Sequence, residues 1–516
     1  MKKTFVWVLI IFFLAVFLRF YKLGEIPNGL YQDETAIGYN AYSILQTGKD
    51  EHGVSWPLYF KSFGDYKLPV YIYLTAISVK LFGLNEWAVR FPSALFGTLT
   101  VVVMYFFVNK LFKTNIAIFS ALLLAINPWH LHYSRATFEV TIALFFLMLG
   151  AYLLPRKFLV GTLCFIIAFY SYNLTRLLAP LLYFLCLWVY KLKPKPSVYI
   201  VSFILLLPFF ITLFKAGGAG SATGTFIFTS ASVQAPLLEF RSYLLSMPFN
   251  KLFFNQLFST VWLYLQNVVR YFSVEFFFLT GSPHGNHGIG NVGQFYLFEL
   301  PLMLLGFRIH PLLLGWAVVT IAVAALTREA PHATRSFFLL FPLIIFSALG
   351  LVKIFKTRYK YLFVVFIAYT LVYYFSSYYF RFPVFYAKQW RSADKEVSLY
   401  LKSVESDYDR IIIDKEAGLV YTSILFYQKR IEESIKRAPD DSEGFSEVTS
   451  FGKYEFKEIK DSDYTSPGTL IITTKNDIAA IKEFFYPERP VVISIKQQLA
   501  QYPTTETAYV AIASQK

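Results

Sequence analysis

The sequence predicts a polytopic α-helical membrane protein that carries a small α/β domain at its C-terminal end. Hydrophobic residues make up 56% of the 516 residues and charged residues only 16%, whereas soluble chains carry about 25% charged residues. The net charge of +15 is unevenly spread, because residues 1–384 contain 30 bases but only 12 acids. Residues 385–516 contain 18 bases and 21 acids, which is typical of a soluble domain.

The basic excess does not indicate nucleic-acid binding, because the bases separate apolar runs, as they do in membrane proteins. The two cysteines, Cys164 and Cys186, both lie inside apolar runs. The sequence therefore offers no disulfide framework and no cysteine-rich metal site.

The first element is an apolar run over residues 5–20 that follows Lys2 and Lys3. A signal peptide would end in a small-residue cleavage site, but Arg19-Phe20-Tyr21-Lys22 follows instead. We therefore expect an uncleaved first span with a cytoplasmic N-terminus. Ten further apolar runs follow, several of them shorter than the ~20 residues of a straight span. They lie near 90–110, 115–131, 138–154, 158–174, 176–190, 197–214, 295–307, 309–326, 336–352 and 360–378.

The apolar run at 70–82 decides the orientation of every later segment. If it does not cross the membrane, the basic clusters between the later runs share the cytoplasmic side with Lys2 and Lys3, as the positive-inside rule requires. We therefore expect 70–82 to be an interfacial or half-inserted helix. The sequence thus predicts about 11 transmembrane helices in the plasma (inner) membrane and an extracytoplasmic C-terminus. The clusters are Lys110/Lys113, Arg156/Lys157, Lys191/Lys193/Lys195 and Lys353/Lys356/Arg358/Lys360.

This topology divides the chain into a membrane domain (1–384) and an extracytoplasmic α/β domain (385–516). The membrane domain has a first external loop at 21–88 and a long external loop at 215–294. Aromatic amphipathic stretches around 237–278 are expected to lie on the membrane surface.

In the C-terminal domain, short apolar runs predict strands and amphipathic runs predict helices. The polar segment 436–466 is interpreted as loop. Neither a GxGxxG motif nor a P-loop occurs there, so nucleotide binding has no sequence support. The expected strands are 410–413, 469–473, 491–495 and 508–511, and the expected helices are 388–404 and 477–485.

Carboxylates concentrate in the first external loop, where seven of the twelve acids of residues 1–384 lie between residues 25 and 86. Carboxylates near the bilayer are costly and usually functional. Asp50 and Glu51 lie between glycines and are interpreted as a solvated turn. Asp33 and Glu34 begin an amphipathic segment, where Asp33 could cap a helix. We favour a catalytic or binding role for this pair.

A second polar cluster contains Asp65 and Lys67, followed by Pro69. Proline suits the first turn of a helix, so Lys67 is expected just before a helix N-terminus, which is a natural phosphate site. The alternative is that the Lys67 side chain simply reaches toward the membrane surface.

Two further clusters lie at predicted membrane exits. Arg135 and Glu139 would share one face of a helix, either as an ion pair or as part of a lipid-phosphate site. His332 and Arg335 lie in the segment 327–336, whose simpler interpretation is an ordinary polar turn.

In their order along the chain, these motifs resemble the GT-C glycosyltransferases, in particular the protein O-mannosyltransferase and lipid A aminoarabinose transferase superfamily. The resemblance covers about residues 1–350 and is strongest over 20–140. Asp33 and Glu34 match the acidic pair after the first span. Lys67-Leu68-Pro69 resembles the family's Lys-Pro-Pro element. Arg135 matches an arginine that ends the family's third span. The following matches complete the resemblance: Glu139 as an acidic companion, Arg90 in a structural Arg-x-Pro element, and His332 with Arg335 in a turn of many bacterial members.

The resemblance implies a polyprenyl-phosphate sugar donor and an inverting, single-step transfer outside the membrane to a lipid, surface glycan or protein acceptor. Lys67, Arg135 and Arg335 would meet the donor phosphate, with Asp65, Glu139 and His332 beside them. Asp33 would accept the acceptor proton, and Glu34 would position a substrate. No cofactor is required, and a divalent metal held by the acidic loop and histidines (His130, His132, His284, His287) stays open.

Two rival functions stay open at this point. A transporter or flippase for lipid-linked sugars predicts charges near the centres of spans and broken helices. An O-antigen ligase-like transferase, which uses a diphosphate-linked donor, fits the long external loop but not Asp33 and Glu34 after the first span. A purely structural membrane scaffold would leave the acidic loop without a reason.

Overall fold

A computed structural model describes residues 2–215, 226–228, 239, 243, 255–418, 420–441, 445–464, 466–473, 491–496 and 507–513. The chain divides into two compact units, and neither is continuous in sequence. Unit 1 comprises Met1–Tyr21, Asp65–Val70 and Ser93–Phe375, and unit 2 comprises Lys22–Gly64, Tyr71–Pro92 and Ser376–Lys516. Most of the first external loop therefore belongs to the same unit as the C-terminal residues.

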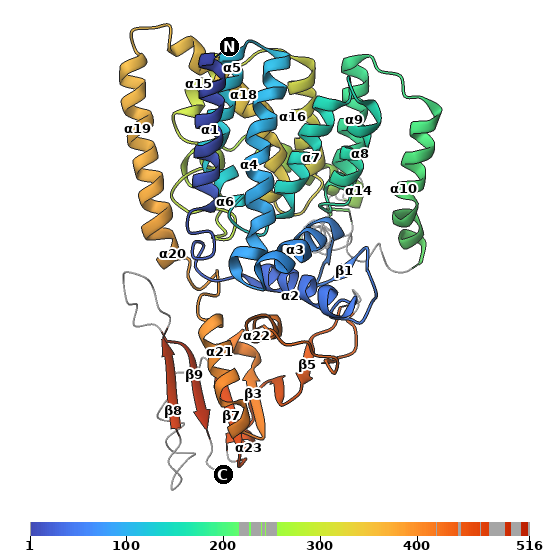
Figure 1. Ribbon diagram of the computed structural model, residues 1–516, viewed down its shortest axis with the longest axis vertical. Helices are drawn as coiled ribbons and strands as arrows, with labels where there is room; N and C mark the ends of the chain where they lie inside the picture. The colour runs from blue at the N-terminus through green and yellow to red at the C-terminus, as the bar shows by residue number, and fades with distance from the viewer. Residues whose placement is uncertain are drawn as a thin grey trace. The chain divides into compact units, whose positions relative to one another are not determined.

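Unit 1 is a bundle of helices, many of which lie side by side (Figure 1). In the described part of the chain, every apolar run expected to span the membrane contains a helix. The bundle comprises α1 (Lys2–Phe20), α4 (Glu86–Leu111, from Ser93), α5 (Thr114–Ile126), α7 (Glu139–Leu153), α8 (Phe158–Phe169), α9 (Thr175–Tyr190), α10 (Pro196–Lys215), α15 (Glu299–Gly306), α16 (Pro311–Ala324), α18 (Leu340–Ile354) and α19 (Lys360–Ser376).

Only some of these helices are long enough to cross a bilayer alone. Among the described residues, three continuous helical stretches meet the length and hydropathy of a span, at Glu86–Leu111, Ala333–Ile354 and Lys360–Phe385. Most of the other described helices of the bundle are shorter, for example α5, α8 and α16 with 13, 12 and 14 residues, less than the ~20 that a straight span needs. The expected number of spans thus depends on the short helices.

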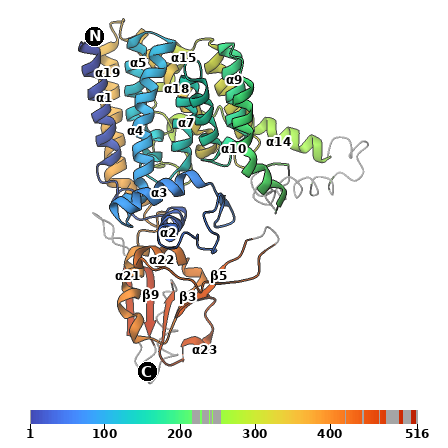
Figure 2. The same cartoon turned by 45° about the vertical axis from the view of Figure 1, so that its right-hand side comes forward.

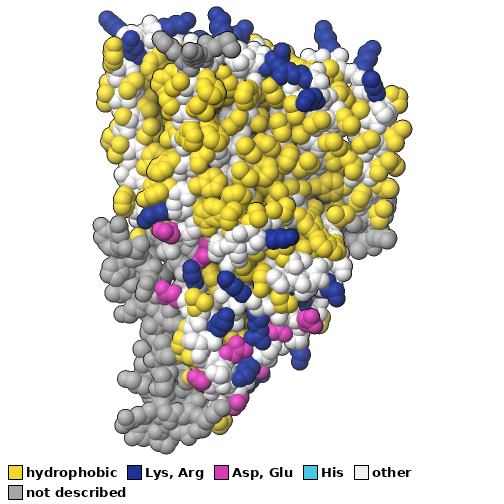
Figure 3. Space-filling view, viewed as in Figure 1, with side chains coloured by type: hydrophobic (Ala, Val, Ile, Leu, Met, Phe, Trp, Pro, Cys, Tyr) yellow, Lys and Arg dark blue, Asp and Glu magenta, His cyan; other side chains and the backbone are white. Residues whose placement is uncertain are grey.

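The surface of unit 1 has the character of a membrane protein. Large apolar side chains such as Trp188, Leu304 and Tyr361 are at least 70% exposed. Figure 3 shows apolar side chains covering the bundle and lysines and arginines gathered at one end of it. The connections α4–α5, α7–α8, α9–α10 and α18–α19 carry exposed bases. The predicted basic clusters therefore lie at helix ends, as the positive-inside pattern requires.

Glycines allow two of these helices to approach closely. A Cβ atom at Gly306 of α15 would lie 1.9 Å from the Phe346 carbonyl oxygen, and one at Gly350 of α18 would lie 2.0 Å from the Leu302 carbonyl oxygen. Because no side chain fits there, α15 and α18 pack backbone to backbone, which is a common way for membrane helices to associate.

Shorter elements connect the bundle helices of unit 1. Figure 2 shows α14 (Gln256–Arg270) running across the direction of the bundle helices. Its exposed face carries Leu257, Val261 and Val269, as expected of a helix at a membrane surface. The other connections are α6 (Pro128–Tyr133), a π-helical turn (Glu275–Leu279), α17 (Ala333–Ser336) and a 3-10 turn (Phe337–Leu339).

Within the described residues, unit 2 contains a mixed sheet of seven strands in the order β4-β5-β6-β3-β7-β9-β8. The central strand β3 pairs in parallel with β6 and β7, whereas the outer pairs are antiparallel. The strands are β3 (Arg410–Asp414), β4 (Lys436–Arg437), β5 (Val448–Phe451), β6 (Tyr454–Lys457), β7 (Thr469–Thr473), β8 (Val491–Lys496) and β9 (Thr507–Ala513).

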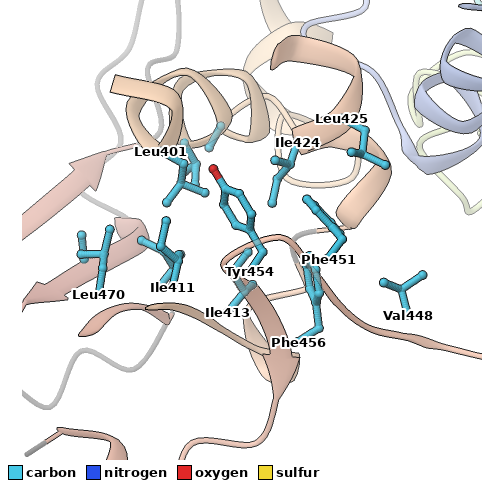
Figure 4. Packing of buried hydrophobic residues seen from close by; sticks show 14 of the residues in the cluster. Leu401, Ile411, Ile413, Ile424, Leu425, Val448, Phe451, Tyr454, Phe456 and Leu470 are labelled. Atoms are coloured by element: carbon cyan, nitrogen blue, oxygen red, sulfur yellow. The ribbon is translucent and has the colours of Figure 1, made fainter. Parts of the chain in front are cut away.

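One face of this sheet is covered by α21 (Asp394–Val404) and α22 (Tyr421–Gln428). Figure 4 shows Leu401 and Ile424 of these helices pointing toward Ile411 and Ile413 of β3 and Tyr454 of β6. All are fully or almost fully buried. The intervening residue of β3, Ile412, lies in a second cluster with Ile471 and Ile512, because successive strand side chains point to opposite faces.

Unit 2 also contains the short α23 (Asp461–Tyr464). Further helices of this unit come from the first external loop and from the segment after α19. α2 (Gln32–Thr47) packs against α22, and a Cβ atom at Gly38 would lie 2.6 Å from the Phe426 ring. α3 (Pro69–Phe82) enters unit 2 at Tyr71, and its Val79 packs with Leu84, Val89 and Phe426. A π-helical turn (Ser377–Arg381) and α20 (Phe382–Phe385) follow α19.

The C-terminal predictions were partly right. The four expected strands match β3, β7, β8 and β9, whereas the expected helix at 388–404 begins only at Asp394. The interpretation of 436–466 as loop was wrong, since β4, β5 and β6 lie there. These short strands alternate buried Val448, Phe451 and Tyr454 with polar residues, and Gly452 turns the chain at φ +51°. α22 was not predicted, and the expected helix at 477–485 lies outside the described residues.

Candidate active site

Lys67 lies immediately before a helix, as the sequence predicted. It ends the short strand β2 (Tyr66–Lys67), and α3 begins at Pro69. The Lys67 ammonium nitrogen lies 3.8 Å from Asp65 Oδ2, and the two side chains are 15% and 38% exposed. Asn173 donates to Asp65 Oδ1 (3.3 Å) and to the Tyr66 carbonyl (2.9 Å), which holds the segment in place.

Tyr172, which neighbours Asn173 in the α8–α9 connection, lies among the charged candidates of unit 1. Burial raises the pKa of the Tyr172 phenol above its usual range, and the charges of Arg335 and Lys67 oppose the rise while Glu139 and Asp65 add to it. Four residues predicted for the donor site are therefore close enough to act on one phenol. We call these four charged residues with Tyr172 and Asn173 the Tyr172 cluster.

The segment 327–336 presents Arg335 and His332 from α17. Arg335 forms an ion pair with the Glu329 carboxylate (3.7 Å) and donates a hydrogen bond to the Glu329 carbonyl (3.2 Å). His332 caps α17, because its Nδ1 accepts from the Thr334 backbone N–H at 3.2 Å, and its Nε2 lies 3.6 Å from Glu329. Burial, with Arg335 as a further cause, lowers the pKa of His332 well below its usual range.

His287 is a second histidine near the Tyr172 cluster. Burial lowers the pKa of His287 to about 3, and Arg335 and Lys67 are among the charges that contribute. Its ring centre lies 5.0 Å from that of His332. The Tyr133 hydroxyl lies 3.2 Å from His287 Nδ1 and 2.9 Å from Thr334 Oγ1, so a polar network joins α6, the 281–294 loop and α17.

Arg135 is fully buried, and two of its hydrogen bonds reach the end of α1. Its guanidinium donates to the Leu18 carbonyl (2.8 Å) and the Arg19 carbonyl (3.2 Å). The prediction that Arg135 and Glu139 share a helical face was wrong. α6 ends at Tyr133 and α7 begins at Glu139, so the residues between them form a turn.

Asp33 and Glu34 lie in unit 2, in the first turn of α2. The residue that caps this helix is Tyr31, so the alternative role of Asp33 as the cap is wrong. Asp33 is partly exposed, whereas Glu34 is completely buried.

Both carboxylate oxygens of Glu34 accept hydrogen bonds from Arg90, at 3.0 and 2.9 Å. Arg90 also donates to the carbonyls of Leu23 (3.1 Å), Pro27 (2.9 Å) and Gly29. A buried charge is tolerated only when it is paired and hydrogen-bonded, and this network meets that requirement. Gly29 has φ +93°, and a Cβ atom there would lie 2.3 Å from the Trp390 carbonyl oxygen. Arg90 thus fixes the loop that leads into α2.

Asp50 and Glu51 do not form a solvated turn, and that interpretation was wrong. They are only 5% and 8% exposed. Glu51 accepts hydrogen bonds from Asn40 (2.9 Å), from Arg437 (3.0 Å) and from the Tyr421 hydroxyl. The partners from the C-terminal segment lie more than 300 residues away in sequence, so no local pattern could reveal this burial.

Of the histidines suggested as further metal ligands, His284 and His287 lie near each other, with ring centres 6.2 Å apart. His132 Nε2–H donates to the Asn286 carbonyl (2.9 Å), and His130 lies 2.8 Å from an Arg19 nitrogen. Across the residues that the structure describes, no group of three His, Cys, Asp or Glu side chains could hold a metal ion.

Sequence reasoning missed Tyr172, Asn173 and His287. The first two were counted within a single apolar run at 158–174, although α8 ends at Phe169 and α9 begins at Thr175. The polar triplet Ser171-Tyr172-Asn173 was the available signal. His287 was noted only as a metal ligand, and its approach to Lys67 and Arg335 depends on tertiary packing.

Part of the chain matches a known family. Residues 66–214, which include Lys67, Arg135, Glu139 and Tyr172, match the family model described as dolichyl-phosphate-mannose-protein mannosyltransferase. Two proteins of Bacillus subtilis (strain 168), YycA and YkcB, are described as candidate mannosyltransferases. They are 26% identical over 169 residues and 25% identical over 166 residues. The alignments cover 32% and 31% of this chain but only 23% and 22% of those relatives.

The whole fold is similar to a solved structure. ArnT from Cupriavidus metallidurans in the apo state superposes with a TM-score of 0.56 at 12% identity, over 99% of both chains. The same enzyme bound to undecaprenyl phosphate gives a TM-score of 0.55 at 13% identity, again over 99% of both chains. Residues 66–214 thus match a mannosyltransferase family model, and the whole chain shares its fold with ArnT.

Proposed function

We propose that this protein transfers a sugar from a polyprenyl-phosphate donor to a lipid, surface glycan or protein acceptor on the extracytoplasmic face of the plasma (inner) membrane. The observation that carries the proposal is the Tyr172 cluster, in which Lys67 and Arg335 lie near one partly buried phenol at the ends of apolar helices. A cationic group beside an apolar surface suits a phosphate on a lipid tail.

In the proposed reaction, the acceptor oxygen forms a bond to the anomeric carbon as the bond from that carbon to the donor phosphate breaks. One displacement inverts the anomeric centre. The leaving phosphate gains negative charge, which Lys67 and Arg335 would stabilise. Asp65 and Glu139 lie in the same cluster and would hold these cations in position between turnovers. His332 would support Arg335 through their shared partner Glu329.

The acceptor hydroxyl must lose its proton during the attack. Asp33 is the proposed general base, because it is a partly exposed carboxylate in the first turn of α2. Glu34 is a positioning residue in this proposal, since its oxygens are bonded to Arg90. Arg135 donates to two carbonyls at the end of α1. In this proposal it meets the donor phosphate from that position.

The proposed topology places the basic helix ends in the cytoplasm and the Tyr172 cluster outside. Across the described residues, Arg19 ends α1 and Glu299 begins α15, so both charges lie at helix ends rather than near span centres. This distribution favours a transferase over the transporter alternative, which requires charges inside the spans.

A donor screen tests the proposal. Purified protein in lipid nanodiscs would be given labelled polyprenyl monophosphate sugars or diphosphate sugars with lipid, glycan and peptide acceptors. We expect transfer from a monophosphate donor only. Replacement of Lys67 by methionine should lower kcat/KM for the donor at least tenfold, whereas Lys49→Met, at an exposed lysine of the same loop, should not. Transfer from diphosphate donors alone, or equal rates in the two variants, would overturn the proposal.

A further inference from the structure

Unit 2 contains a cavity that the proposed transfer chemistry does not use. Its volume is about 620 Å³, within the usual range of small-molecule sites. The first external loop forms one wall and the segments around β4, β5 and the start of α22 form the other. Residues of its lining that matter here are Ser62, Phe63, Tyr421, Arg437, Phe445 and Glu447.

The charges around the cavity are balanced. Each cation of the lining already faces a carboxylate, with Lys61 2.9 Å from Asp440, Lys415 2.6 Å from Glu447 and Arg437 3.0 Å from Glu51. An anion site would need cations that are not compensated in this way. With these cations paired, the lining favours hydroxyl groups over an anion, because each hydroxyl can both donate and accept.

Aromatic side chains supply the apolar surface. The rings of Phe63 and Tyr421 lie 5.9 Å apart, and the Lys61 ammonium lies 5.9 Å from the centre of the Phe445 ring. Flat apolar faces beside polar groups match a sugar ring, whose C–H face is apolar and whose edge carries hydroxyls. A charged phosphate or a long acyl chain would use only one of these two features.

The polar part of the wall is held rigidly. Glu51 binds the Tyr421 hydroxyl and Arg437, and the Arg437 guanidinium also lies over the Tyr421 ring at 5.5 Å. Supporting bonds of this kind fix the geometry of a binding site before a ligand arrives. Nearby, the Ser62 hydroxyl is buried and has no hydrogen-bond partner among the residues that the structure describes. A buried hydroxyl without a partner is unusual and would be satisfied by a ligand hydroxyl.

We propose that this cavity binds a neutral saccharide of one or two rings, as part of the acceptor. The proposal rests on the proposed function for the acceptor role, but saccharide binding itself does not depend on it. The lining of the cavity includes Gly64, three residues before Lys67 in the sequence. Only two residues of the chain therefore separate the lining of this cavity from Lys67, which is proposed to meet the donor phosphate.

Saturation-transfer NMR on the full-length protein in lipid nanodiscs tests the proposal, because many detergents carry sugar head groups. The probes are maltose and chitobiose as neutral disaccharides and glucose 6-phosphate as an anionic comparison. We expect a neutral disaccharide to bind. Filling the cavity by Ser446→Phe or removing a ring by Phe63→Ala should raise its Kd at least tenfold. The matched control Ser403→Phe, at an exposed serine of α21, should leave the Kd within twofold.

Binding of undecaprenyl phosphate and the melting temperature are measured on the same samples. We expect both to be unchanged in the three variants, which shows that they are folded. The proposal is overturned if neither disaccharide binds the wild-type protein, if glucose 6-phosphate binds more tightly than both, or if Ser446→Phe and Phe63→Ala bind like the wild type. A wild-type protein that binds disaccharide but not undecaprenyl phosphate would support the saccharide site and count against the proposed donor.

Discussion

Asp33 and Glu34 are neighbours in sequence but differ in what holds them. Glu34 is fully buried, with both oxygens bonded to Arg90, whereas Asp33 is partly exposed in the first turn of α2. A general base must reach a proton on the acceptor, so exposure matters as much as charge. Because of this difference we propose two separate tasks for the pair, proton transfer for Asp33 and positioning for Glu34.

Replacement of Asp33 by asparagine should lower the transfer rate about 10²-fold or more, since positioned proton transfer contributes about that much. The melting temperature should stay within about 2 °C of the wild type, because surface substitutions change stability little. The control is Glu25→Gln, at an exposed carboxylate of the same loop. A purified Asp33→Asn protein with the wild-type rate would remove Asp33 from the mechanism.

His287 should make stability depend on pH. Burial lowers its pKa to about 3 in the folded protein, against about 6.5 in the unfolded chain. Below pH 6.5 the unfolded chain therefore binds a proton that the folded protein does not, and the free energy of unfolding falls as pH falls. At pH 5.5 this histidine alone should lower the free energy of unfolding by about 1.4 kcal/mol relative to neutral pH.

The measurement is the melting temperature between pH 7.5 and 5.0, for the wild type and for His287→Gln, whose side chain does not titrate. On acidification, the melting temperature of the variant should fall less than that of the wild type. Replacement of the exposed His284 by glutamine serves as the comparison and should follow the wild-type slope more closely. Identical slopes for wild type and His287→Gln would contradict the assigned pKa.

At the scale of elements, the Arg90–Glu34 pair links α4 to α2. The two residues lie 56 positions apart, and both are 0% exposed. Removing one partner of a buried pair leaves the other charged and unpaired, which typically costs about 3–5 kcal/mol. Arg90→Ala should therefore lower the melting temperature far more than Arg358→Ala, at an exposed arginine of the α18–α19 connection.

Thermal unfolding followed by size-exclusion chromatography in detergent measures this difference. The double variant Arg90→Leu/Glu34→Leu removes both charges, so it should be more stable than Arg90→Ala. If Arg90→Ala unfolds at the wild-type temperature, the pair does not organise the first external loop.

Elements differ in how well local sequence predicted them. The apolar helices and the strands β3 and β7 were predicted because a run of apolar residues is a local signal. β5 and β6 were missed because their apolar residues alternate with polar ones inside a polar stretch. The short α22 was missed because eight residues are too few for a clear helical period.

At the scale of the whole molecule, the basic helix ends predict orientation. We expect Lys113, in the α4–α5 connection, to face the cytoplasm, and Ser406, in the C-terminal segment, to face outside. Cysteines introduced at these sites test this, because the native Cys164 and Cys186 are buried. A membrane-impermeant maleimide should label Ser406→Cys in intact cells and Lys113→Cys only after permeabilisation. The opposite labelling pattern would invert the topology and move the Tyr172 cluster to the cytoplasmic side.

The sequence by itself determined the membrane class, the position of nearly every apolar helix and the place of Lys67 just before a helix. Those conclusions follow from composition, charge and short motifs, which are properties of neighbouring residues. The site was predicted as a set of separate clusters. Asp65, Lys67, Glu139 and Arg335 were all named, but nothing in the sequence indicated that they meet around Tyr172.

Tertiary structure alone decided which of these side chains act together. It paired Glu34 with Arg90, joined Glu51 to Arg437 across 386 residues, and turned Arg135 toward the end of α1. The physical reason is that the cost of burying a charge can be met by a partner from any part of the chain. Only the packing of distant segments shows which partner was chosen, and so which carboxylates remain for chemistry.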